Sequence, residues 1–180
     1  MNEDDDATAV QACLQGDRQA FAALVERYDR PVYNAALRML RSPEDARDVT
    51  QTVFLKAFQG LASYDPDFKF YSWIYRIAIN ETLNWQRVRR RETDPVDDQH
   101  PADGPGPEDA VAEDDSRRQL LDAIQKLKPE YRAVITLRYF VDRSYEDIGQ
   151  ILGIEEKTVK SRLFTARQLL KDLLPPQGAN

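Results

Sequence analysis

An acidic segment rich in proline and glycine divides this chain and restricts what each side of it can fold into. Residues 93–113 contain four prolines, two glycines and almost no large apolar residue. From Asp94 to Asp115 there are nine acidic residues and no Lys or Arg. A segment of this composition cannot bury a core. We therefore predict an acidic flexible linker at 93–113, which joins two small domains at 1–92 and 114–180.

Apolar residues on both sides of the linker recur at three- and four-residue spacing, which is the helical period. Ser42, Pro43 and Asp45 supply a capping hydroxyl, a proline at the first helical position and an acid at the third. They predict a helix that runs to about Gly60, with an inward stripe of Ala46, Val49, Val53 and Ala57. No stretch shows the alternating pattern of a strand. The predicted fold class is all-α, with two small helical domains.

Other helices are predicted from capping residues and breakers. Asp17 is expected to cap a helix whose apolar face runs from Phe21 to Leu40, and Pro31 is expected to kink or break that helix. A long helix is predicted over about 70–90, and shorter ones over 119–127 and 129–140. Cys13 is expected to be a small buried helix residue. The tail 175–180 should be frayed.

The stretch 144–170 has the spacing of a helix-turn-helix. Ser144 caps a first short helix, Gly149 allows a second helix to pack closely, and Gly153 supplies a left-handed turn. Val159 and Leu163 then anchor the second helix, whose other positions suit a DNA major groove. An ordinary helical hairpin with a solvated basic face is the alternative. The residues proposed to contact DNA are Lys157, Thr158, Lys160, Ser161, Arg162, Phe164 and Arg167.

A second candidate surface lies in 68–91, where aromatic side chains alternate with arginines and amides. Aromatic rings stack on unpaired bases, and the four basic residues in 87–91 suit a nucleic-acid backbone. Asn80 and Asn84 are one helical turn apart and share a face, so their amides can read a base edge. Trp73 also follows the spacing of core positions, and packing in the core is its alternative role.

Charge and the rare residue types exclude several function classes. The net charge of −6 hides its distribution, because 157–171 carries five basic residues and no acid. Cys13 and His100 are single residues of their types, so the sequence predicts no metal site, and nothing in it indicates a cofactor. The acidic N-terminus is unlike a secretory signal, and no apolar run approaches a membrane span, so we expect a cytoplasmic protein without membrane insertion.

Three ordered stretches together resemble one protein family. They are EDARDVTQTVFLKAF at 44–58, FYSWIYRIAIN at 70–80, and the long stretch from KLKPEYR to SRLFTAR at 126–167. In this order, with an acidic linker between the second and third, they closely resemble the extracytoplasmic-function (ECF) group of the sigma-70 family. The resemblance implies an RNA polymerase sigma factor, which is not an enzyme. Its first domain would bind core polymerase and melt the minus-ten promoter element, and its second would read the minus-thirty-five element.

The resemblance also assigns roles to residues of this chain. Polymerase binding falls on Asp45, Asp48, Gln51 and Phe54. Minus-ten DNA binding falls on Ser63, Tyr64, Phe68, Lys69, Trp73, Arg76, Asn80 and Asn84, and the seven helix-turn-helix residues take the minus-thirty-five element. Thr52 and Thr165 depart from the family, which often has Glu and a basic residue there. The implied partners are core RNA polymerase, promoter DNA and an anti-sigma factor.

Two other functions remain open on the residues alone. A stand-alone helix-turn-helix regulator explains the second domain but leaves the aromatic and arginine-rich helix without a role. It would bind duplex DNA tightly without polymerase. An enzyme would have to use Glu44, Asp45 and Asp48, which crowd the first turns of a capped helix where carboxylates are ordinary.

Overall fold

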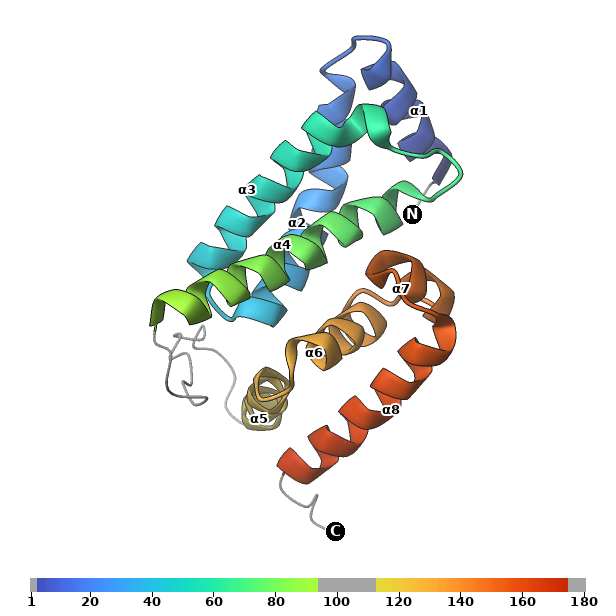
Figure 1. Ribbon diagram of the computed structural model, residues 1–180. Helices are drawn as coiled ribbons and strands as arrows, with labels where there is room; N and C mark the ends of the chain where they lie inside the picture. The colour runs from blue at the N-terminus through green and yellow to red at the C-terminus, as the bar shows by residue number, and fades with distance from the viewer. Residues whose placement is uncertain (1–2, 94–112, 175–180) are drawn as a thin grey trace.

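The computed structural model describes residues 3–93 and 113–174, and all regular structure in these residues is helical. The helices form two bundles (Figure 1). The prediction of an all-α fold is confirmed, while most of the predicted linker and the whole tail lie outside the described residues. The first bundle contains α1 (Glu3–Leu14), α2 (Ala20–Leu40), α3 (Pro43–Gly60), the short η1 (Leu61–Ser63) and α4 (Phe70–Thr93). The second contains α5 (Glu113–Gln125), α6 (Pro129–Ile135), the π-helix η2 (Thr136–Phe140), α7 (Tyr145–Leu152) and α8 (Glu156–Leu173).

The core of the first bundle lies where α2, α3 and α4 pack together. Helix α3 begins as the sequence predicts, because the Ser42 hydroxyl accepts a hydrogen bond of 3.2 Å from the backbone N–H of Asp45. Its predicted inward stripe is fully buried and faces α2 and α4; the four residues are Ala46, Val49, Val53 and Ala57. Small residues on this stripe let neighbouring helices approach closely.

Helix α2 continues through Pro31, so the predicted kink or break at this residue is wrong. Proline removes only one helical hydrogen bond here, the one to the Arg27 carbonyl. Tyr28 and Val32, on either side of the proline, are completely buried. Their packing against the rest of the bundle offsets the lost bond, and the helix runs on to Leu40.

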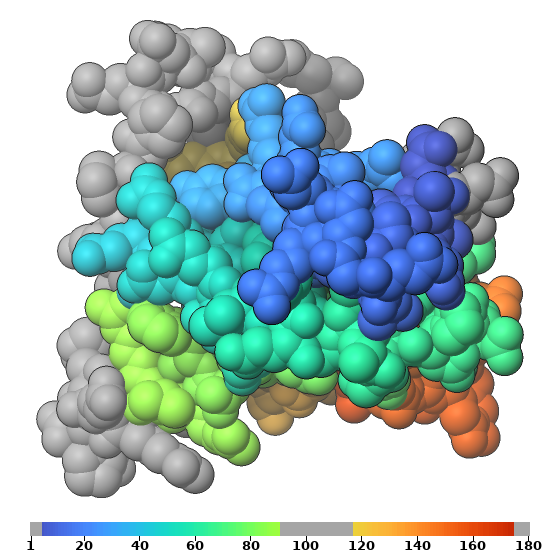
Figure 2. All heavy atoms as spheres, turned by 90° about the horizontal axis from the view of Figure 1, so that it is seen from above, coloured from blue at the N-terminus to red at the C-terminus, as the bar shows by residue number. Residues whose placement is uncertain are grey.

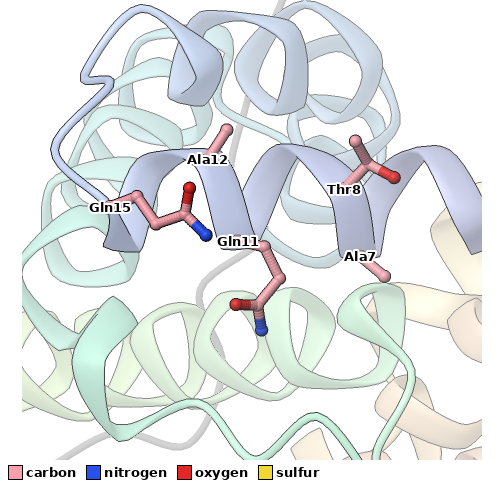
Figure 3. Close-up of a pocket in the computed structure, with 5 residues that line it drawn as sticks. All are labelled: Ala7, Thr8, Gln11, Ala12 and Gln15. Carbon is pink, nitrogen blue, oxygen red and sulfur yellow. The ribbon is translucent and has the colours of Figure 1, made fainter.

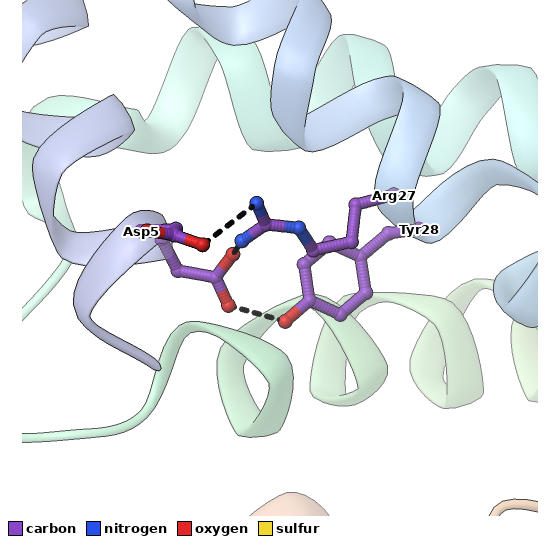
Figure 4. A network of polar contacts seen from close by, with 4 residues as sticks. Asp5, Arg27 and Tyr28 are labelled. Atoms are coloured by element: carbon purple, nitrogen blue, oxygen red, sulfur yellow. Dashed lines mark hydrogen bonds and ion pairs between the residues drawn. The ribbon is translucent and has the colours of Figure 1, made fainter. Parts of the chain in front are cut away.

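Helix α1 is an element that the sequence analysis did not predict. The buried carboxylate of Asp6 accepts hydrogen bonds from the Arg27 guanidinium and the Tyr28 hydroxyl, and Asp5 lies 3.7 Å from Arg27 (Figure 4). Burial and the bond to Asp6 both raise the pKa of Tyr28 above its ordinary value. The acidic start of the chain therefore anchors α1 onto α2.

Two smaller expectations near α1 also change. Cys13 is in a helix, as expected, but it is half-buried rather than buried. Asp17 does not occupy the capping position of α2. Its side chain accepts a 2.9 Å hydrogen bond from the backbone of Gln19, which is one residue ahead of the helix.

In the second bundle, α8 lies along one side and packs on α5, α6 and α7 (Figure 1). The predicted helix 129–140 is present, but its last turn is the π-helix η2. Buried Ile148 of α7 and buried Leu163 of α8 belong to the core between these helices.

The two bundles are in direct contact. Helix α4 packs against α7, and the C-terminal end of α2 packs against α6 and η2. Seen from above, the first bundle covers most of the second, which is visible only at the edges (Figure 2).

Candidate nucleic-acid interface

The turn between α7 and α8 has the geometry predicted for a helix-turn-helix. Ser144 forms a capping box, in which its hydroxyl accepts from the N–H of Asp147 at 3.0 Å while its own N–H donates to the Asp147 carboxylate. Gly153 adopts the left-handed conformation with φ of 65°. At Gly149 a Cβ atom would lie 2.8 Å from the carbonyl oxygen of Ile154, so only glycine fits without a shift of the turn.

Helix α8 presents a mixed polar, basic and aromatic surface. Val159 and Leu163 are buried against the rest of the bundle, as predicted. The ring of Phe164 is 58% exposed, which is unusual for a side chain that would normally be in a core. Of the other predicted contacts, Lys157, Lys160, Ser161 and Arg167 are exposed, whereas Thr158 and Arg162 are half-buried. The α8 face therefore contains five of the seven predicted residues in exposed positions.

Two acids at the start of α8 pair with its lysines. The Lys160 ammonium lies 2.6 Å from a Glu156 oxygen, and the Lys157 ammonium lies 2.8 Å from a Glu155 oxygen. The hydrogen bond to Glu156 raises the pKa of Lys160. Neither acid was among the residues predicted to shape this surface, which were basic, polar or aromatic. The i, i+4 spacing of Glu156 and Lys160 was the signal that could have revealed this pair.

On α4, four predicted residues lie on one side of the helix at three- and four-residue spacing. They are Trp73, Arg76, Asn80 and Asn84, and all except Trp73 are exposed. Arg87 donates a 2.7 Å hydrogen bond to the Asn84 side-chain oxygen. The Asn80 amide is thus the more available of the two amides for a base edge.

The loop before α4 contains an aromatic cluster. The Tyr64 ring lies 5.4 Å from the Trp73 ring, and both rings contact Phe70. The Tyr64 hydroxyl donates to the Phe68 carbonyl, which folds the loop back on itself. Trp73 is half-buried in this cluster, so it has a packing role and keeps one accessible side.

The remaining loop residues predicted to bind DNA surround this cluster. Phe68 is 49% exposed and Lys69 is exposed beside the Tyr71 ring. Ser63 is exposed, and its hydroxyl donates a 2.7 Å hydrogen bond to the Gly60 carbonyl. The loop therefore offers exposed aromatic, hydroxyl and cationic groups next to the Asn80 side of α4.

Helix α3 carries the four residues predicted to bind polymerase. Two of them are exposed, and the other two are paired or buried. Asp48 and Gln51 are exposed. Asp45 is paired with Arg89 of α4, and Phe54 is only 8% exposed, so the Phe54 ring belongs to the core. The assignment of Phe54 to a contact surface is therefore corrected. The exposed apolar residues on the same side of α3 as Asp48 are Leu55 and Phe58, which the sequence analysis missed.

Residues 3–93 and 113–174 were also searched for a pocket, a metal site and a membrane-spanning helix. A shallow hollow on α1 is lined by Ala7, Thr8, Gln11, Ala12 and Gln15, which include no ionisable side chain (Figure 3). Among residues 3–93 and 113–174, no group of three or more His, Cys, Asp or Glu could hold a metal ion. No helix in these ranges is long and apolar enough to span a membrane.

The second bundle carries a helix-turn-helix with an exposed basic face, and the first bundle carries exposed amides and aromatic rings on α4 and the loop before it. Together they define a DNA-binding protein of helical architecture. Residues 24–92 match Sigma-70 region 2, and residues 117–170 match Sigma-70, region 4. The chain belongs to the sigma-70 family, in its ECF group.

Related proteins agree with this assignment over nearly the full chain. The ECF RNA polymerase sigma factor SigW of Bacillus subtilis is 36% identical over 92% of this chain and 94% of its own length. The RNA polymerase sigma-H factor of Pseudomonas aeruginosa is 32% identical over 98% and 97%. The ECF RNA polymerase sigma-E factor of Escherichia coli strain K12 is 32% identical over 95% of both chains.

Two solved structures share the fold. CnrH, solved in complex with the cytosolic domain of CnrY, has a TM-score of 0.72 and 26% identity, with 94% of this chain and 96% of CnrH covered. The sigma factor RpoE of Bartonella quintana, solved in complex with the anti-sigma factor NepR, has a TM-score of 0.71 and 25% identity, with 88% and 98% covered.

Proposed function

We propose that this chain binds core RNA polymerase, recognises the minus-thirty-five and minus-ten elements of promoters, and opens the DNA for initiation. The observation that supports the proposal is that two exposed surfaces with basic, amide and aromatic side chains, on α8 and on α4, belong to separate bundles of one sigma-70 chain. Catalysis remains with the polymerase, and this chain needs no cofactor or metal for its part. It supplies sequence preference.

Minus-thirty-five recognition is assigned to α8. An α-helix of this kind enters the major groove, where its N-terminal part contacts base edges while cations hold phosphates. Lys160 and Ser161 are exposed one turn from the helix start, and exposed Phe164 follows one turn later. An aromatic ring there suits the apolar methyl group of thymine.

Minus-ten recognition and strand opening are assigned to α4 and the loop before it. Turning a base out of the stack costs a few kcal/mol, which a binding pocket for the base offsets. Exposed Asn80 offers an amide, and exposed Phe68 and half-buried Tyr64 offer aromatic surface. Recognition of the base and opening of the duplex would then be one event.

Polymerase binding is assigned to the exposed side of α3. Asp48 and Gln51 provide polar groups, and Leu55 at 58% exposure and Phe58 at 40% provide apolar area. Exposed apolar groups among polar ones are typical of a protein interface. An anti-sigma factor is the second proposed partner, since RpoE was solved in complex with the anti-sigma factor NepR and CnrH with the cytosolic domain of CnrY.

Reconstitution with core polymerase tests the whole proposal. The holoenzyme is used to select promoter fragments from a random library, and the selected fragments are transcribed and probed with permanganate for unpaired thymines. We expect two conserved elements at fixed spacing and reactive thymines at the downstream one. Tight binding of the isolated chain to duplex DNA, with no effect on core polymerase, would support a stand-alone regulator instead.

A further inference from the structure

A series of side-chain contacts connects Asp6, on α1, to the loop 64–69 that precedes α4. We propose that Asp6 is a positioning residue for minus-ten recognition, which acts through Tyr28 and keeps this loop in the shape that receives an extruded base. The inference rests on the proposed function for the role of the loop, but the contacts themselves are a property of the isolated chain. No residue of α1 was among those predicted to bind DNA.

The first contact in the series joins α1 to α2. Asp6 is only 3% exposed, and its carboxylate accepts hydrogen bonds from the Arg27 guanidinium and the Tyr28 hydroxyl. Burial of a carboxylate is costly unless the group is paired and hydrogen-bonded, so these two donors allow Asp6 to lie inside the bundle. In turn, the carboxylate fixes where the hydroxyl of the completely buried Tyr28 lies.

The second contact joins the Tyr28 ring to the start of α4. The centre of this ring lies 5.4 Å from the centre of the Phe70 ring, and the two ring planes are inclined by 55°. Tilted aromatic pairs at such a separation attract one another and have a preferred geometry. Phe70 is the first residue of α4 and is only 3% exposed. Because buried side chains are closely packed, a shift of the Tyr28 ring would displace the residue at which the loop ends.

The third contact joins Phe70 to the rings that shape the loop. The centres of the Tyr64 and Trp73 rings lie 5.8 Å and 5.6 Å from the centre of the Phe70 ring. The Tyr64 hydroxyl donates a hydrogen bond to the Phe68 carbonyl. The Phe68 ring is 49% exposed, and the proposed function assigns it to base capture. The series therefore begins at a buried carboxylate and ends at an exposed ring of the proposed minus-ten surface.

The charge of Asp6 also acts on the loop directly. Burial is the largest cause that raises the pKa of Tyr64, and the negative charge of Asp6 is the next. Helix α1 contacts η1, which ends at Ser63, the residue before Tyr64 (Figure 1). The loop thus has α1 and its buried acid close to one end, and Phe70 at the other.

The position of the loop matters because base capture needs a preformed pocket. Turning a base out of the stack costs free energy, which a binding pocket for that base must offset. A loop that adopts several shapes binds with an affinity reduced by the fraction of chains in the competent shape. The 3.1 Å hydrogen bond from the Phe68 N–H to the Asp65 carbonyl sets the turn within the loop. The aromatic contacts, in contrast, set where the loop lies on the bundle.

The first test follows the loop in the isolated full-length chain. Trp85→Phe leaves Trp73 as the single tryptophan, and incorporation of 5-fluorotryptophan then gives one fluorine resonance from within the aromatic cluster. Asp6→Ala removes the carboxylate, and Tyr28→Phe removes only the hydroxyl bonded to it. We expect one narrow resonance in the parent and a shifted or broadened one in both variants. The double variant should change no more than the more affected single variant, because both substitutions break the same contact.

The matched control is Thr50→Ala, which removes a different buried hydroxyl from the same bundle. Thr50 is 4% exposed, and its hydroxyl donates a 2.7 Å hydrogen bond to the Ala46 carbonyl. This variant should lower the melting temperature but leave the Trp73 resonance unchanged, and circular dichroism should show equal helicity in all variants. An unchanged resonance in Asp6→Ala and Tyr28→Phe would overturn the inference, as would an equal change in Thr50→Ala.

The second test measures strand opening and separates the positioning role from the proposed function. Each variant is assembled with core polymerase on a promoter selected by the parent holoenzyme, and permanganate reactivity of thymines reports the open complex. We expect Asp6→Ala and Tyr28→Phe to bind core polymerase as tightly as the parent. Their open complexes should be fewer by on the order of tenfold, the scale on which one lost hydrogen bond to a charged group shifts a population.

The two tests fail in different ways. A changed Trp73 resonance with normal strand opening in both variants would overturn the positioning role and leave the sigma function standing. Additive losses of opening in the double variant would also overturn it, because Asp6 and Tyr28 would then act separately. A parent chain that gives no promoter-specific transcript, although its resonance responds to Asp6→Ala, would overturn the proposed function and leave the contact between Asp6 and the loop established.

Discussion

The ammonium of Lys160 lies 2.6 Å from the carboxylate of Glu156, one turn earlier on the exposed side of α8. A lysine proposed to contact promoter DNA is therefore already paired with an acid of its own helix. Before it can bind a phosphate, this pair must separate, and the Glu156 carboxylate must tolerate the nearby negative charge of DNA. The pair reduces the electrostatic attraction of the recognition helix to duplex of any sequence.

Replacing this acid should strengthen DNA binding. We expect Glu156→Gln to raise the affinity of the holoenzyme for minus-thirty-five DNA about two- to fivefold at low salt, since an exposed pair of this kind is worth little. Fluorescence anisotropy across a salt series measures it. Lys160→Ala should act in the opposite direction, with a shallower salt dependence if a phosphate contact is lost. Equal affinity in both variants would remove Lys160 from the DNA surface.

Reversing a charge on α3 should abolish polymerase binding without unfolding the chain. Asp48 is exposed and its helix is packed through the opposite side, so Asp48→Arg should leave the melting temperature within about 2 °C of the parent. A competition pull-down with core polymerase should show at least a tenfold loss. Phe54→Ala is the contrasting variant, because removal of this buried ring should cost about 3–5 kcal/mol of stability. A stable Phe54→Ala protein that fails to bind polymerase would return Phe54 to the interface.

Asn80 should affect strand opening more than binding to polymerase. Its amide is exposed on α4 beside the aromatic loop, so Asn80→Ala should lower open-complex formation and relax preference at one minus-ten position. The expected loss is about 1–3 kcal/mol for a bidentate base contact. Permanganate reactivity of promoter thymines measures it. Unaltered base preference on duplex and pre-opened templates, with lower thermal stability, would mean that Asn80 has only a local structural role.

Acid should weaken the α4 to α7 contact. Burial would raise the pKa of Asp147, but hydrogen bonds from Tyr71 and Ser144, aided by the nearby charge of Lys69, outweigh it and lower this pKa. A carboxyl group with a lowered folded-state pKa stabilises the fold above its unfolded pKa of about 3.9, and this stability is lost as the pH falls through the folded value.

Urea unfolding between pH 7 and pH 3 measures this contribution. We expect Asp147→Asn to be less stable than the parent by about 1 kcal/mol at pH 7, because charge-assisted bonds are lost. The difference should begin to shrink as the pH falls below about 4, the pKa in the unfolded chain, and should vanish only below the lowered folded-state pKa, where the parent carboxyl group is neutral as well. A difference that is constant across the series would show that Asp147 acts through shape rather than charge.

The local elements of this fold were accessible from sequence because each depends on neighbouring residues. The start of α3 at Ser42, the capping box at Ser144 and the turn at Gly153 were predicted from single residues, and the structure shows all three. Continuity of α2 through Pro31 was not predictable in this way. It depends on burial of Tyr28 and Val32 against other helices, and local propensity carries no information about that.

Some features of the candidate site could not be predicted from the sequence either, because they depend on contacts between residues that are far apart in the chain. Spacing placed Phe54 on α3 but could not show that its ring faces the core while Leu55 and Phe58 face outward. Helix α1 was missed because its anchor, Asp6, has partners 21 and 22 residues away, and an acidic stretch gives no sign of burial. The contacts between Tyr71 and Asp147 span 76 residues and were likewise beyond a reading of local pattern.

Gly149 has no side chain that could contact DNA, but it determines how α8 is oriented relative to α7. Its lack of a Cβ atom lets the Ile154 carbonyl sit against it, and its own carbonyl accepts a 3.0 Å hydrogen bond from the Ile154 N–H. The angle at which α8 leaves α7 is set by this close approach. A library of all substitutions, scored for transcription from many promoters, should therefore place Gly149 among the least tolerant positions of the chain. The rare substitutions of Gly149 that still allow transcription should change which promoters are used. They would do so by changing the backbone geometry of the turn, and not by changing a side-chain contact to DNA.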